Sequence, residues 1–122
     1  MKLISKGESL GFDNGGVLRY DHEQDCCEHV YADFENMQII TDVGKNVVDA
    51  TELDFFDDIL KSIVPISGLG FYIVTKQGIC ILVSCYDIQN GYYSGDLTLI
   101  FQHGDEVEEL DITDCTHYEG EL

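Results

Sequence analysis

The chain has 122 residues, of which 44% are hydrophobic and 11% aromatic, enough for one domain with one core but not for two. Its 24 acidic and 6 basic residues give a formal net charge of −18, which repels nucleic acid and anionic lipid and favours basic partners. No stretch approaches the roughly 20 apolar residues that span a bilayer, and "MKLISKGESLGFDN" lacks a signal-peptide core.

The negative charge is concentrated in two blocks. Residues 103–122 contain eight acids and residues 21–35 contain six, and neither block contains Lys or Arg. Charge gathered in this way is typical of a binding surface, although a purely solubilising or halophilic surface is the alternative interpretation. The predicted contacts with a basic partner lie in the block 21–35 and in residues 105–111, where they are Asp105, Glu106, Glu108, Glu109 and Asp111.

The first half of the chain predicts a hairpin, two further strands and short helices. "DNGG" at 13–16 is a turn signal between the apolar segments "SLGF" and "VLRY", and "HVYADF" at 29–34 has strand character. The spacing of apolar residues over 35–46 predicts a short helix that ends near Gly44. Residues 47–56 resemble a strand, and "FFDDILKSI" at 55–63 predicts about one helical turn before Pro65.

The second half predicts an antiparallel meander. "TKQG" at 75–78 joins two apolar runs into a hairpin, and "NGYYSG" at 90–95 leads into a third strand, "DLTLIF". "LDITD" at 110–114 predicts an edge strand. We therefore expect a single α+β domain over residues 1–122, with an N-terminal hairpin, a C-terminal meander, one or two short helices and an acidic segment over 103–122.

The segment "DHEQDCCEHV" at 21–30 predicts a metal site, a redox pair or two ordinary core cysteines. Zinc in proteins takes four thiolate or imidazole ligands, and the candidates are His22, Cys26, Cys27, Cys115 and, two residues further on, His117. The neighbouring acids raise a thiol pKa and so disfavour redox chemistry, whereas bound Zn²⁺ would hold the thiolates deprotonated.

The remaining cysteines and the absent motifs predict a protein without catalytic activity. A cytoplasmic chain keeps its thiols reduced, and five is an odd number for a closed disulfide framework. Cys80 and Cys85 lie in the apolar run "GICILVSCY" and are interpreted as core residues. The sequence has no glycine-rich phosphate loop, no G-x-S-x-G and no H-E-x-x-H, so we do not expect an enzyme.

Two stretches carry a resemblance to a known group of proteins. "YDHEQDCCEHVY" resembles the Y-H-x-Q-D-C-C-E-x-V signature of a family of small uncharacterised phage and bacterial proteins, and "GICILVSCYDIQNGYYSGDLTLIF" is similar to the closing strands and S-N-G-Y-Y-S turn of that family. The resemblance covers roughly residues 10–101. The motif positions are His22, Gln24, Asp25, Cys26, Cys27 and Glu28.

The chain departs from that family at three places. His29 replaces a residue that is usually small or polar, Cys85 stands where the family tends to have Trp, and the acidic tail with Cys115 and His117 lies beyond the family pattern. The motif therefore supports His22, Cys26 and Cys27 as a shared site more than it supports a ligand from the tail.

A second resemblance concerns the general character of the protein and not an alignment of residues. Small acidic phage proteins without catalytic motifs are similar to anti-CRISPR proteins, which cover the basic channels of RNA-guided nucleases, and at least one kind contains zinc. This resemblance implies a stoichiometric inhibitor of a CRISPR nuclease in the host-cell cytoplasm, with a structural Zn²⁺ and no direct contact with nucleic acid. The alternative is a small zinc-binding accessory or regulatory module that has no nuclease target.

Overall fold

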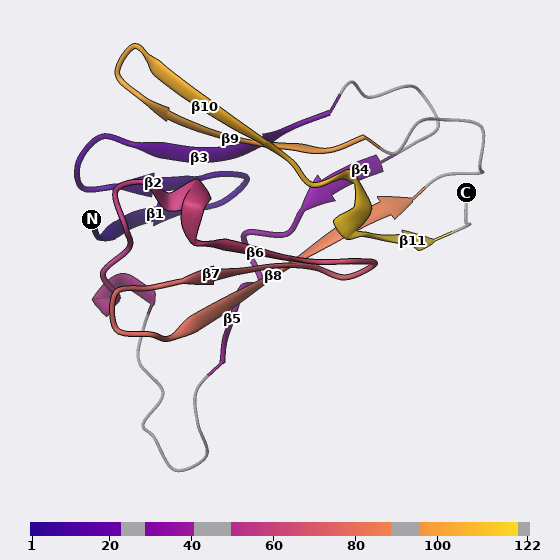
Figure 1. Ribbon diagram of the computed structural model, residues 1–122, viewed down its shortest axis with the longest axis horizontal. Coiled ribbons are helices and arrows are strands. Elements are labelled where there is room, and N and C mark those ends of the chain that lie inside the picture. The colour runs from indigo at the N-terminus through magenta and orange to yellow at the C-terminus, as the bar shows by residue number, and fades with distance from the viewer. Residues whose placement is uncertain (23–28, 41–49, 89–95, 120–122) are drawn as a thin grey trace.

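Two β-sheets face each other across one hydrophobic core in the computed structural model, which describes residues 1–22, 29–40, 50–88 and 96–119 (Figure 1). The first sheet has the strand order β1 (Leu3–Lys6), β2 (Leu10–Phe12), β3 (Val17–Asp21), β9 (Thr98–His103) and β10 (Glu106–Asp111). All its neighbouring strands are antiparallel.

The second sheet is built around the long strand β8. Its other strands pair with β8 directly or, in the case of β6, through β7. They are β4 (His29–Ala32), β5 (Gln38–Ile40), β6 (Ile63–Ile66), β7 (Gly70–Val74), β8 (Cys80–Ile88) and β11 (Thr116–Glu119). Only the pairing of β11 with β8 is parallel among the ladders of the described residues.

Both hairpins whose turns could be recognised in the sequence are confirmed. In the β2–β3 turn, Gly15 has φ 86° and the side-chain Oδ1 of Asn14 accepts a hydrogen bond from the Gly16 amide at 2.8 Å. In the β7–β8 turn, Gly78 has φ 78° and the register joins Val74 to Cys80. Glycine at these positions permits the left-handed backbone that such short turns require.

The predicted meander is wrong in its third strand. After β8 the chain crosses to the first sheet, where β9 pairs with β3 and β10, so that Leu99 lies opposite Tyr20 and Leu110. Residues 90–95, where the turn was expected, lie outside the described residues. The strand crosses over because its apolar residues complete the inner face of the first sheet, and Leu99 and Phe101 are buried.

The predicted α+β class is also wrong, since the described residues contain strands and three short 3-10 turns but no α-helix. Where a helix was expected over 35–46, Gln38–Ile40 form strand β5 against Cys80–Leu82, and residues 41–46 lie outside the described part. Residues 50–52 form the 3-10 turn η1 (Ala50–Glu52) in place of a strand. The protein is therefore an all-β domain.

The predicted helical turn within 55–63 is present as the 3-10 turn η2 (Ile59–Ser62). Ile59 and Ile63 are buried as expected, whereas Phe56 is 37% exposed. Near this turn, Phe55 packs edge-on against Phe12 with ring centroids 5.2 Å apart. Burying an aromatic side chain of this size stabilises the fold by roughly 1.5–3 kcal/mol.

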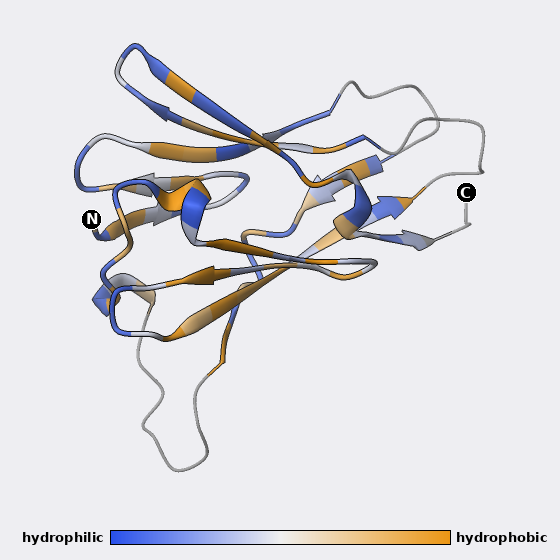
Figure 2. Ribbon diagram, in the orientation of Figure 1, coloured by the Kyte–Doolittle hydropathy of each residue, from blue (hydrophilic) through white to orange (hydrophobic). Residues whose placement is uncertain are grey.

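The acidic tail joins the two sheets. β10 forms the outer edge of the first sheet, and the chain then passes through the 3-10 turn η3 (Thr113–Cys115) into β11 of the second. The edge strand expected at 110–114 thus begins earlier, at Glu106, and ends at Asp111. Figure 2 shows that β10, in the first sheet, mixes hydrophilic and hydrophobic residues, whereas β6 to β8, in the second sheet, are mostly hydrophobic. Within the described ranges, no helix is long and apolar enough to cross a membrane.

Candidate functional site

The β9–β10 hairpin exposes the carboxylates that the sequence predicts as partner contacts. In this hairpin Glu106 lies opposite His103 and Glu108 lies opposite Phe101. Because residues alternate between the faces of a strand, Glu106 and Glu108 share one face, and Glu109 and Asp111 lie on the other. All four, with Asp105 in the turn before β10, are exposed.

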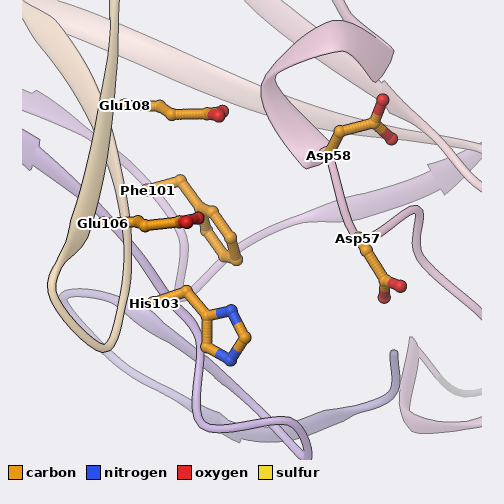
Figure 3. Close-up of a pocket in the computed structure, with 6 residues that line it drawn as sticks. All are labelled: Asp57, Asp58, Phe101, His103, Glu106 and Glu108. Atoms are coloured by element: carbon orange, nitrogen blue, oxygen red, sulfur yellow. The ribbon is translucent and has the colours of Figure 1, made fainter.

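The face that carries Glu106 and Glu108 forms one wall of an acidic cleft. The opposite wall is Asp57 and Asp58, which precede η2, and Phe101 lies between the two walls (Figure 3). The cleft has a volume of about 250 Å³, which is below the ~300–1,000 Å³ of most small-molecule pockets. Its size suits a single inserted side chain.

Two cations lie near the cleft, but both contacts are long. The N-terminal ammonium of Met1 is 3.7 Å from Asp57 and is bonded more closely, at 2.8 Å, to Asp54. Lys61 Nζ is 3.9 Å from Asp58, and both side chains are mostly exposed, so this pair contributes little. Four carboxylates therefore leave the cleft strongly negative.

The chemistry of the cleft favours a guanidinium or ammonium group. Carboxylates are strong charge-assisted acceptors for Arg and Lys, and an aromatic face such as that of Phe101 attracts the same cations. A metal ion is a poorer fit, because no three His, Cys, Asp or Glu side chains in the described part of the chain are placed to hold one.

His103 and Asp111 have local structural partners. His103 Nε2 lies 2.9 Å from the carbonyl oxygen of Asn14, which ties β9 to the β2–β3 turn. The carboxylate of Asp111 accepts hydrogen bonds from the hydroxyl of Thr113 at 2.6 Å and from its amide at 2.9 Å. These bonds lower the Asp111 pKa, with the hydroxyl contributing most. Asp111 therefore shapes the turn into η3 as well as adding charge.

The second acidic block is described only in part. Residues 23–28 lie outside the described residues, while Asp33 and Glu35 gather with Glu8 around Tyr20. Burial, followed by the charges of Glu8, Asp33 and Glu35, raises the pKa of the Tyr20 phenol. This second cleft shares the sign of the first, but it lies beside β3 and β4 and has no contact with the β9–β10 hairpin among its lining residues.

The predicted metal ligands are only partly placed. Cys26 and Cys27 lie outside the described residues. The His22 side chain is 1% exposed, and its Nδ1 meets the backbone carbonyl of Asp96. A carbonyl only accepts a hydrogen bond, so Nδ1 donates its hydrogen, and in the neutral form of the ring the lone pair is on Nε2. Zinc-binding histidines commonly have this arrangement.

Cys115, the predicted ligand from the tail, lies in the hydrophobic core beside Cys85. Burial raises the pKa of both thiols, which favours the protonated form over the thiolate that zinc requires. His117 is exposed on the second sheet, whereas Cys115 ends the 3-10 turn η3 and is buried, so the two side chains lie in different environments. Cys85 is buried as predicted, and Cys80 is half-buried.

Sequence reasoning missed Asp57 and Asp58. The adjacent acids in "FFDDILKS" were visible, but their approach to β10 depends on how residues 55–63 pack beneath the first sheet. Lys61 follows them closely in the sequence, so the two acids do not belong to a block without Lys or Arg.

Fold and cleft together define a small all-β protein with an acidic edge hairpin. Residues 2–99 match the family described as a domain of unknown function (DUF7448), and the chain belongs to that family. The match includes Asp57 and Asp58 and ends within β9, before Glu106 and Glu108. No curated protein and no solved structure matches the chain.

Proposed function

We propose that the protein is an anti-CRISPR inhibitor whose acidic cleft and β9–β10 hairpin bind a basic surface of an RNA-guided nuclease. The observation that carries the proposal is the convergence of Asp57 and Asp58 with Glu106 and Glu108 on one cleft sized for a side chain. Such nucleases hold their guide–target duplex in a positively charged channel. A stoichiometric inhibitor seated there would block DNA binding.

Electrostatics gives this inhibitor its expected kinetic behaviour. A chain with net charge −18 is steered toward a basic channel, and such steering raises association rates and weakens as salt increases. Charge on the rim of an interface mainly changes the association rate, whereas a cation held between carboxylates in a cleft changes the dissociation rate.

DNA cleavage by a panel of guide-loaded CRISPR nucleases, each titrated with the protein, tests the proposal. The variant Glu106→Gln/Glu108→Gln removes two cleft charges and keeps side-chain size, and Glu8→Gln/Glu35→Gln is the matched control from the second cleft. We expect the wild type and the control to inhibit one nuclease at equimolar ratio. The cleft variant should be about 100-fold weaker, since each charge-assisted hydrogen bond contributes roughly 1.5–3 kcal/mol.

Two results contradict the proposal. If no nuclease is inhibited, the anti-CRISPR function is wrong. If the cleft variant inhibits as well as the control does, inhibition does not depend on the acidic cleft.

The second candidate function is a zinc-binding accessory module, and the His22–Asp96 contact favours it. In this proposal His22 would bind through Nε2 together with Cys26 and Cys27, and zinc would stabilise the fold. Elemental analysis of untagged protein beside a Cys26→Ser/Cys27→Ser variant tests it. About one zinc per chain, lost in the variant together with thermal stability, supports a structural site. Metal-free wild type rules it out.

A further inference from the structure

The outward face of the second sheet differs from the acidic β9–β10 hairpin in the character of the side chains that its strands expose. The inward residues, such as Phe71 and Val83, are fully buried, so the residues between them point outward. Among outward strand residues whose side chains the structure describes, none is Asp, Glu, Lys or Arg. Asp33 lies one residue beyond β4 at the margin, where its carboxylate accepts hydrogen bonds from Asn36.

An apolar row crosses this face near its middle. Val64 pairs with Tyr72, Tyr72 with Leu82, and Leu82 with Gln38. Val64 is 47% exposed, and Ile40, one row away on β5, is 45% exposed. Val64, Tyr72 and Leu82 form an apolar row across three strands, and on the fourth strand, β5, the row reaches polar Gln38 with exposed Ile40 beside it.

An aromatic row lies toward the other end of β8. Tyr86 pairs with Tyr31 on one side and with His117 on the other. The Tyr31 and Tyr86 rings are 5.3 Å apart, and Tyr86 meets His117 edge-on at 6.4 Å. His29 stacks on Tyr31 at 4.3 Å. Tyrosine is enriched in protein interfaces because it combines a large apolar body with a polar tip.

We propose that this uncharged face is an interface between two copies of the chain. The described side chains of this face offer a basic partner no carboxylate, and Glu119 lies only at its end, where it pairs with Ile88; the first sheet offers Glu109 and Asp111. Two copies that each carry −18 repel wherever carboxylates face one another, so the uncharged face is where they approach at the least electrostatic cost. A two-fold dimer buries the same patch on both subunits and needs only self-complementarity.

The size of the face is consistent with a weak dimer. The nine residues of β8 span about 30 Å at ~3.3 Å each. The face is four strands wide at most, which is about 19 Å at ~4.8 Å per strand. Two copies would bury at most about 1,100 Å², near the lower end of specific interfaces at ~1,200 Å². The face borders the acidic cleft at Asp58, which also lines a groove with Val64. None of the strand residues that form the face lines the cleft, so this inference does not depend on the proposed inhibitor function.

Sedimentation equilibrium of the whole chain from about 1 μM to about 1 mM tests the dimer, in about 0.05 and about 0.5 M NaCl. The variant Ile40→Glu/Val64→Glu adds two carboxylates to the face at exposed positions. Ile4→Glu/Val107→Glu is the matched control, since Ile4 and Val107 are 67% and 51% exposed on the first sheet. A milder variant, Gln38→Glu, adds one charge at a site that is already polar.

In the wild type and the control we expect twice the 13.7 kDa chain mass at high concentration, with tighter association in high salt because repulsion is screened. The double variant should raise the dimer Kd about 100-fold and Gln38→Glu about tenfold, since each 1.4 kcal/mol is tenfold. A wild type that remains monomeric at about 1 mM in high salt overturns the proposal. So does a face variant that associates as tightly as the control.

Discussion

Replacing Gly70 with alanine tests how closely β7 and β8 approach within the second sheet. A Cβ atom at Gly70 would lie 2.0 Å from the carbonyl oxygen of Val83 and 2.9 Å from Ser84 Cα. Ordinary van der Waals contact begins at 3.4 Å, so the strands must separate by about 1.4 Å. β8 is held on both sides by other strands and has little freedom to move.

The expected loss of stability combines two terms. Overpacking costs roughly 1–3 kcal/mol, and weakened ladder hydrogen bonds add roughly 0.5–1.5 kcal/mol each. We therefore expect Gly70→Ala to lower the free energy of unfolding by about 3 kcal/mol, measured from guanidinium unfolding midpoints with unchanged m-values.

Two glycines with open space around them serve as controls. At Gly7 an added Cβ would have no atom within 4 Å, so Gly7→Ala should change stability by less than about 0.5 kcal/mol. Gly68 is equally open but has φ 74°, so Gly68→Ala should cost about 1–2 kcal/mol through backbone strain alone. The reasoning is refuted if Gly70→Ala costs no more than Gly68→Ala.

Three further outcomes are expected. Hydrogen bonds from the Met1 ammonium and from Thr113 lower the pKa values of Asp54 and Asp111. Each carboxylate therefore stabilises the fold above its unfolded pKa, and this stabilisation disappears as pH falls below about 4. The variant Asp54→Asn should flatten the acid limb of a curve of unfolding free energy against pH. An unchanged acid limb would contradict this prediction. Burial raises the pKa values of Cys85 and Cys115, so native alkylation mapped by mass spectrometry should spare both and modify half-buried Cys80 faster; equal rates would contradict it. Raising NaCl should increase the Tm by screening self-repulsion, and a Tm that is flat or falls would show that the −18 charge does not strain the fold.

The hairpins could be predicted from the sequence because their turn chemistry is local. "DNGG" and "TKQG" contain the glycines whose positive φ closes each turn. The sheet that β9 joins could not be predicted in the same way. The alternation of apolar residues in β9 fits either sheet, and the pairing of β9 with β3 depends on contacts about 80 residues away in the chain.

The helix predicted over 35–46 shows the limit of periodicity in short segments. Met37 and Ile40 are three residues apart, which fits one helical face, but a three-residue strand is too short to reveal a period of two. Ile39 turns toward the core, and Ile40 lies on the outward face. Strand pairing with β8, which is remote in sequence, therefore overrides local propensity.

The candidate site was partly predictable for a related reason. The run of acids without Lys or Arg predicts that Glu106 and Glu108 are exposed whatever the fold. The opposite wall, Asp57 and Asp58, is brought near only by tertiary packing. The burial of Cys115 could not be predicted either, because it depends on a 3-10 turn that directs the side chain into the core.

Displacement of labelled target DNA from a guide-loaded CRISPR nuclease tests the central claim most directly. Fluorescence anisotropy would be followed while unlabelled wild-type protein, Glu106→Gln/Glu108→Gln or Glu8→Gln/Glu35→Gln is added. If the acidic cleft occupies the basic channel, the wild type and the second-cleft control release the DNA at equimolar ratio. The cleft variant then requires about 100-fold more protein. DNA that stays bound with wild-type protein, or is released equally by all three, would contradict the account.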